Sequence, residues 1–155
     1  MSPRVVFDTM LFFQWVARPP ERQLPATFQA VEDGRLTLCL GTTLLEEVRD
    51  VLSRVELRTR FRHLTDDIVD AFVRRVRTLS TWFPQVPNAF TILLHPKDDH
   101  LFDLAITAQA QYLVTWETRL LELRTRYPND AERLRMLAPE LEVVDPAMLA
   151  RVLAK

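Results

Sequence analysis

The chain has 155 residues, 48% of them hydrophobic and 26% charged, with a formal net charge of −1 at pH 7. These values fit one globular domain over residues 1–155 that buries a sizeable core, and they exclude a strongly basic nucleic-acid coat. Only two glycines are present, which excludes a glycine-rich phosphate loop, and no apolar run approaches the roughly 20 residues of a membrane helix.

The single cysteine, Cys39, excludes an internal disulfide and suggests a reducing, cytoplasmic location. It lies in an apolar run, so we expect a buried thiol. The N-terminus reaches Asp8 too soon for a signal peptide. We therefore expect a cytoplasmic protein that does not enter the membrane.

Short apolar runs alternate with longer amphipathic segments along the chain. The expected strands are 5–7, 36–40, 91–93, 112–115 and 141–144. The expected helices are 10–16, 24–33, 43–53, 65–79, 98–109, 118–126 and one that starts at Pro146. This alternation predicts a doubly wound α/β domain with a central, mainly parallel sheet covered by helices on both faces.

Two of the expected helices carry an apolar stripe with helical spacing. In the first, the stripe consists of Leu44, Val48, Val51 and Leu52. In the second, it consists of Ile68, Phe72, Val76 and Leu79. We expect both stripes to face the core.

Acidic residues recur where the expected strands end or the following helices begin. They are Asp8, Glu47, Asp99 and Glu117. If the sheet is parallel, all four lie near its carboxyl edge, where α/β proteins place their working groups. Taken singly, each residue has a structural explanation as well, since an acid beside a helix N-terminus caps it and complements its dipole.

Helical geometry separates Glu47 from its neighbour Glu46. At 100° per residue, Glu47 lies about 100° from the centre of its apolar stripe and Glu46 about 160° from it. Glu47 can therefore point along the sheet edge, whereas Glu46 faces water. Asp99 and Asp103 form an i, i+4 pair on one side of their helix.

Carboxylates gathered in one place repel one another unless a cation neutralises them. Hard oxygen ligands favour Mg²⁺ or Mn²⁺, and neither histidine nor cysteine forms a competing cluster in this sequence. Such an ion could polarise a phosphodiester oxygen and activate a water molecule.

Four segments together resemble a PIN domain, and most closely the toxin components of bacterial type II toxin–antitoxin systems. They are Val-Val-Phe-Asp-Thr at 5–9, Leu-Leu-Glu-Glu-Val-Arg-Asp-Val-Leu at 44–52, Pro-Lys-Asp-Asp-His-Leu-Phe-Asp-Leu-Ala at 96–105 and Tyr-Leu-Val-Thr-Trp-Glu-Thr-Arg-Leu-Leu-Glu-Leu at 112–123. Each motif alone is weak, but four in this order form a fairly specific signal.

The resemblance implies a three-layer α/β/α sandwich and an Mg²⁺- or Mn²⁺-dependent endoribonuclease that hydrolyses single-stranded RNA. It assigns catalysis and metal binding to Asp8, Glu47, Asp99 and Glu117, with Asp103 as an auxiliary metal ligand. It also implies a homodimer that a cognate antitoxin protein silences.

The sequence departs from the family pattern at two places. Met10 stands where the family usually has Asn, and Trp116-Glu117 replaces the usual Gly-Asp. These departures favour an alternative, a weakened or inactive PIN module that binds RNA or a protein partner. A third reading, a phosphotransferase with Asp8 as nucleophile, lacks the second acid that it needs two residues on, at Met10.

Arginines near the proposed edge are the expected phosphate contacts, because guanidinium binds phosphate in a bidentate manner. They are Arg18, Arg22, Arg119 and Arg124. Trp15 and Trp116 could each stack on a base, and for Trp15 burial is the stronger expectation.

Overall fold

The computed structural model describes residues 2–92 and 96–155. Its centre is a parallel sheet in the order β3-β2-β1-β4-β5, in which every neighbouring pair is parallel. The strands are β1 (Arg4–Phe7), β2 (Thr37–Gly41), β3 (Ser80–Phe83), β4 (Tyr112–Val114) and β5 (Glu142–Val144). The predicted α/β fold with a central parallel sheet flanked by helices is confirmed.

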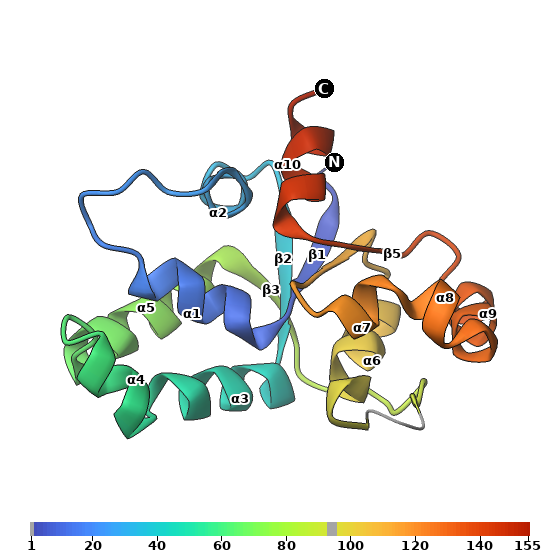
Figure 1. Cartoon of the computed structure of the whole chain (residues 1–155), viewed down its shortest axis with the longest axis horizontal. Helices are drawn as coiled ribbons and strands as arrows, with labels where there is room; N and C mark the ends of the chain where they lie inside the picture. The colour runs from blue at the N-terminus through green and yellow to red at the C-terminus, as the bar shows by residue number, and fades with distance from the viewer. Residues whose placement is uncertain (1, 93–95) are drawn as a thin grey trace.

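Helices cover the sheet on both sides (Figure 1). They are α1 (Thr9–Ala17), α2 (Ala26–Glu32), α3 (Thr42–Leu52), α4 (Val55–Arg60), α5 (Asp66–Leu79), α6 (Asp99–Ala108), α7 (Thr118–Leu121), α8 (Leu123–Arg126), α9 (Pro128–Leu137) and α10 (Pro146–Leu153), with a short 3-10 turn, η1 (Pro96–Asp98), before α6. Helices α1, α3, α4 and α5 lie on one side of the central strands, and α6 to α9 lie on the other.

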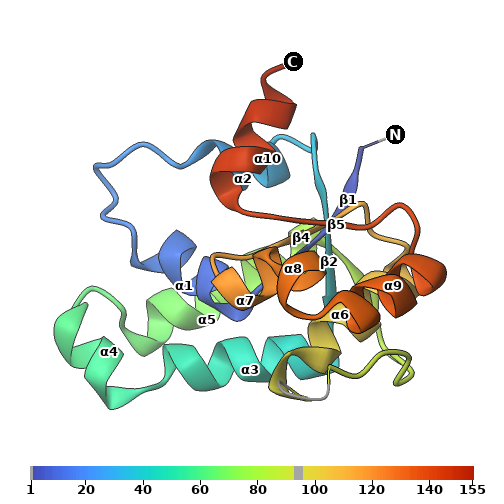
Figure 2. The ribbon, with the colours of Figure 1, turned by 45° about the vertical axis from the view of Figure 1, so that its right-hand side comes forward.

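Helices α2 and α10 lie together at the amino edge of the sheet, where both termini are found (Figures 1 and 2). The hydroxyl of Thr27 in α2 donates a hydrogen bond to the carbonyl of Pro146 at 3.3 Å. The carboxyl ends of the strands lie at the opposite edge of the sheet, and the candidate site lies there.

Local sequence explains several elements of this fold. Val5, Val6 and Phe7 of β1 are fully buried, as expected for a central strand with helices on both faces. The stripe of α3 packs into the core as predicted. Gly34, at a φ of 74°, follows the end of α2 in the left-handed conformation that glycine adopts without strain.

The prediction of a strand at 91–93 is wrong for its described part. Thr91 and Ile92 are in a loop, and Leu93 lies outside the described residues. The third strand is instead β3, which follows α5 directly and pairs with β2 through Leu38 and Ser80. The backbone N–H of Ile92 donates to Asp99 rather than to a neighbouring strand.

Some helical predictions also need correction. In α5 the buried residues are Val69, Val73 and Val76, whereas Ile68 is 47% exposed, so the core-facing side is rotated from the predicted stripe. The predicted helix over 118–126 divides into α7 and α8, and α4 and α9 were not predicted. The late edge strand and the helix starting at Pro146 are confirmed as β5 and α10.

Cys39 is fully buried as expected, and burial raises the pKa of its thiol to about 11. Within the described ranges, no helix combines the length and the apolar character that crossing a bilayer requires.

Candidate functional site at the carboxyl edge of the sheet

Asp8 is fixed at the point where β1 ends. Its backbone N–H donates to the carbonyl of Val114 at 2.9 Å, which continues the pairing with β4 by one residue. Its carboxylate accepts a hydrogen bond of 2.8 Å from the hydroxyl of Thr115, a fully buried residue. The same hydroxyl oxygen accepts the N–H of Glu117 at 3.0 Å. Thr115 therefore ties the ends of two central strands together around the carboxylate.

The surroundings of Asp8 oppose its negative charge. Burial raises the pKa of the Asp8 carboxyl above 3.8, and the charges of Asp98 and Glu117 raise it further. Hydrogen bonds from Thr115 and from the backbone of Thr9 act in the opposite direction without cancelling the effect of burial. A cation in this place would relieve both the burial of the charge and the repulsion between the carboxylates.

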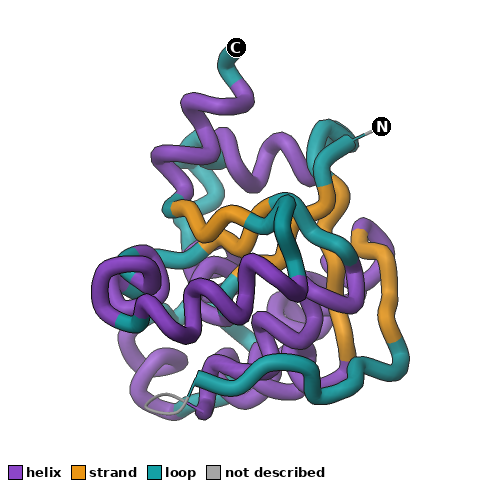
Figure 3. Tube along the Cα trace, turned by 90° about the vertical axis from the view of Figure 1, so that its right-hand side faces the viewer, coloured by secondary structure: helices purple, strands orange, loops and turns teal. Residues whose placement is uncertain are grey.

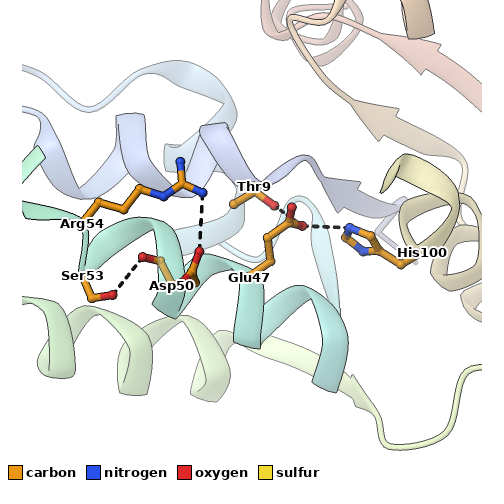
Figure 4. A network of polar contacts seen from close by, with 6 residues as sticks. All are labelled: Thr9, Glu47, Asp50, Ser53, Arg54 and His100. Atoms are coloured by element: carbon orange, nitrogen blue, oxygen red, sulfur yellow. Dashed lines mark hydrogen bonds and ion pairs between the residues drawn. The ribbon is translucent and has the colours of Figure 1, made fainter. Parts of the chain in front are cut away.

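Glu47 reaches the same edge from the first half of α3. The hydroxyl of Thr9 and Nε2 of His100 both donate to Oε2 of Glu47, each at 2.8 Å (Figure 4). The hydrogen bond from His100 is the main reason that the pKa of Glu47 lies below 4.5. Glu46, the preceding residue, is exposed. Thr9 follows Asp8 and His100 follows Asp99 in the chain, so Glu47 is held between the segments that carry the other predicted ligands.

Asp99 and Asp103 share one side of α6, as predicted, and both contact the loop that follows β3. Oδ1 of Asp99 accepts the N–H of Ile92 at 2.8 Å. Oδ1 of Asp103, which is 4% exposed, accepts the N–H groups of Ala89 and Phe90 at 2.8 and 2.9 Å. Figure 3 shows this long loop running along the carboxyl edge toward α6. The pair therefore holds the loop in place.

An open pocket of about 290 Å³ lies in front of Asp8, and we call it the acidic pocket. It is lined by Asp8, Met10, Trp116, Glu117, Thr118, Arg119 and Arg126. Nη2 of Arg119 contacts Oε2 of Glu117 at 3.3 Å, and Nε of Arg126 contacts Oε2 of Glu122 at 2.6 Å. Carboxylates and guanidinium groups thus meet in one depression.

The structure separates the four predicted RNA-binding arginines. Arg119 lines the acidic pocket. Arg18 and Arg22 follow the far end of α1, where Arg18 donates to the carbonyls of Pro19 and Arg22. Arg124 lines a different pocket of about 480 Å³, between α7 to α9 and β5.

Several residues that contribute to the site were not predicted from the sequence. Asp98 acts on the charge of Asp8, Thr115 and His100 hold carboxylates, and Arg126 lines the acidic pocket. In the sequence, Asp98 is only the first residue of the expected helix over 98–109, directly before the predicted ligand Asp99. Nothing in the sequence shows that Asp99 accepts the N–H of Ile92, or that the charge of Asp98 acts on Asp8.

The carboxylate oxygens of the site suit a hard dication chemically, but they are not arranged as a complete coordination shell. Across residues 2–92 and 96–155, no group of three or more Asp, Glu, His or Cys side chains is arranged to hold a metal ion. Asp8 and Glu117 both line the acidic pocket, and carboxylate oxygens are what Mg²⁺ and Mn²⁺ prefer.

The described strands form a five-stranded parallel sheet, and Asp8 and Glu117 line one pocket where its central strands end. The family profile described as PIN domain matches residues 4–119, which are 116 of the 155 residues, and the chain belongs to the PIN domain family. PIN domains are generally nucleases and typically use divalent metal ions. No curated protein matches the chain, and no solved structure matches it.

Proposed function

We propose that this protein is a metal-dependent endoribonuclease that hydrolyses phosphodiester bonds of single-stranded RNA. The observation that carries the proposal is the acidic pocket at the end of the central strand, which is lined by the half-buried carboxylate of Asp8 together with Glu117. The charges of Asp98 and Glu117 add to the effect of burial in raising the pKa of Asp8. Such a carboxylate is costly for the fold alone and is useful where a cation has to be bound.

The site residues have distinct roles in this proposal. Asp8, Glu47, Asp99 and Glu117 would hold Mg²⁺ or Mn²⁺, with Asp103 as an auxiliary ligand that also supports the loop. The charge of Asp98 acts on Asp8 and would favour the same cation. Thr115 orients Asp8, and Thr9 and His100 orient Glu47. Arg119 and Arg126 face the same pocket and can bind RNA phosphates. When bound, the ion supplies Lewis-acid activation of water and of the phosphodiester.

The test is cleavage of single-stranded RNA by the purified full-length chain. We expect cleavage with Mg²⁺ or Mn²⁺, none with a chelator, and loss of cleavage in Asp8→Asn and Asp99→Asn. Glu46→Gln is the matched control, because Glu46 is an exposed carboxylate on the same helix as Glu47. Cleavage that persists in Asp8→Asn would refute the assigned site.

A second function, an inactive PIN module that binds RNA or protein, is favoured by particular contacts. Oε2 of Glu47 and Oδ1 of Asp99 are engaged by donors from the protein itself. Met10, in place of a polar residue, is 45% exposed at the acidic pocket. An inactive module would show no metal-dependent cleavage of any single-stranded RNA, while still binding its ligand.

We also propose that the protein acts as the toxin of a toxin–antitoxin pair in the cytoplasm, as a homodimer that a cognate antitoxin inhibits. The support is the resemblance of residues 44–52, 96–105 and 112–123 to such toxins, together with the single buried cysteine. Growth arrest on expression, relieved by coexpression of the neighbouring small gene, would support this role. Light scattering would give the oligomeric state.

A further inference from the structure

We propose that Trp116 is a stacking platform for one unpaired base of the RNA, placed beside the phosphodiester that Asp8 serves. This inference rests on the proposed function in taking RNA as the ligand, and it names the feature of the substrate that the acidic pocket recognises. The site would therefore require a single strand, because a paired base is already stacked within its duplex.

The indole of Trp116 is exposed and yet held in place. The residue is 48% exposed and lines the acidic pocket next to Asp8 and Glu117. Its Nε1 donates a hydrogen bond to Oε1 of Gln14 at 3.0 Å. A ring already held in one orientation loses little conformational entropy when a base stacks on it. Trp15, by contrast, is 6% exposed and stacks on Phe28 in the core.

Helix α1 adds a second apolar side chain to the pocket beside Trp116. Met10 and Gln14 are four residues apart in α1 and so lie on one face of the helix. That face supplies both the hydrogen-bond acceptor for Trp116 and the exposed side chain of Met10, which lines the same pocket. A flexible thioether adapts to different aromatic ligands. Met10 and Trp116, which both depart from the family pattern, therefore line the same pocket, and we call these two side chains the apolar rim.

The charges of the same pocket favour RNA over a protein partner. Glu117 and Asp8 lie beside the rim, and Arg119 and Arg126 complete the lining. Proteins that bind single-stranded nucleic acid commonly combine an aromatic face, on which a base stacks, with positively charged groups that bind the phosphates. A purely apolar partner surface would have to bury these charged groups, and removing charges from water is costly even when they are paired.

The experiment measures RNA binding without cleavage, in full-length protein carrying Asp8→Asn. The ligand is a fluorescently labelled uridine oligomer of about ten nucleotides, compared with an oligomer of equal length whose riboses lack bases and with a duplex. Each is titrated against Asp8→Asn alone and against the same protein with Trp116→Ala or Trp116→Phe. Met136→Ala is the control, since Met136 is an apolar side chain 79% exposed on α9, outside the acidic pocket.

We expect Trp116→Ala to weaken binding of the uridine oligomer by roughly 5- to 150-fold, the range that corresponds to loss of one stacked base. Trp116→Phe should recover most of this loss, and Met136→Ala should bind as the parent does. The oligomer without bases should bind equally to Trp116→Ala and to its parent. The duplex should bind weakly to both.

Equal affinity of Trp116→Ala and its parent for the uridine oligomer, with both proteins folded by circular dichroism, would overturn the proposal and leave the apolar rim to a protein partner. An equal loss for the oligomer without bases would overturn it too. The outcome is separable from the proposed function. Trp116-dependent binding without any cleavage by the unmodified chain would uphold stacking and refute catalysis, whereas cleavage with a KM that Trp116→Ala leaves unchanged would do the reverse.

Discussion

Asp8 shows, at the scale of one residue, a conflict between stability and function. Its pKa is raised in the folded protein, mainly by burial, so the unfolded chain loses its proton more readily than the folded one. The favourable contribution of protonated Asp8 is complete below the unfolded pKa and is lost as the pH rises through the folded value. At neutral pH the ionised carboxylate therefore destabilises the protein when no cation is bound.

Replacing Asp8 with Asn should raise the melting temperature by a few degrees at neutral pH in a chelator. Asn keeps an acceptor for the hydroxyl of Thr115 while removing the buried charge. Thermal unfolding followed by circular dichroism measures this, with Glu46→Gln as the exposed control. A lower melting temperature for Asp8→Asn would show that the charge of Asp8 does not destabilise the folded protein.

The pKa of Glu47 is shifted in the opposite direction from that of Asp8. Its folded pKa is lowered, first by the hydrogen bond from His100, so the stability that it contributes is present above 4.5 and is lost as the pH falls through the folded value. We expect the melting temperature of the unmodified chain to fall more steeply than that of Glu47→Gln as the pH drops below this range. Melting curves across the acid range test this, and parallel pH profiles would contradict it.

At the scale of elements, the loop after β3 depends on α6. Asp103 satisfies the N–H groups of Ala89 and Phe90, and a buried N–H left without a partner costs about 1–3 kcal/mol. Asp103→Ala should therefore lower the free energy of unfolding by at least about 1 kcal/mol and speed amide exchange in the loop. Urea denaturation and hydrogen exchange measure the two effects. Asp70→Ala, at an exposed position of α5, is the control and should change neither.

The elements with a strong local signal were predictable. A few neighbouring residues suffice to predict β1 from its continuous apolar run and α3 from its apolar stripe. The same holds for the start of α5, where the hydroxyl of Thr65 accepts the N–H of Ile68 at 3.3 Å. The missed elements carry little such signal. Helix α4 has no buried residue, and α9 has only Leu134. Strand β3 is a short edge strand that Pro84 follows directly.

At the scale of the whole molecule, parallel topology made part of the site predictable. Strands β1 and β4 end at the same edge, which accounts for Asp8 and Glu117 sharing the acidic pocket. What the sequence could not supply is the direction of each side chain. Asp99 turns to the loop while Asp98 acts on Asp8, and Arg18 lies at the far end of α1 from the pocket. These differences depend on packing between elements distant in the chain.

The most direct test of the central claim is an anomalous diffraction map from crystals soaked in Mn²⁺. The account predicts a manganese peak about 2 Å from an oxygen of Asp8, with further ligands from Glu117 or the other predicted carboxylates, and no such peak in Asp8→Asn. An Mn²⁺-saturated crystal that shows no peak at the acidic pocket, or a peak that persists in Asp8→Asn, would contradict it.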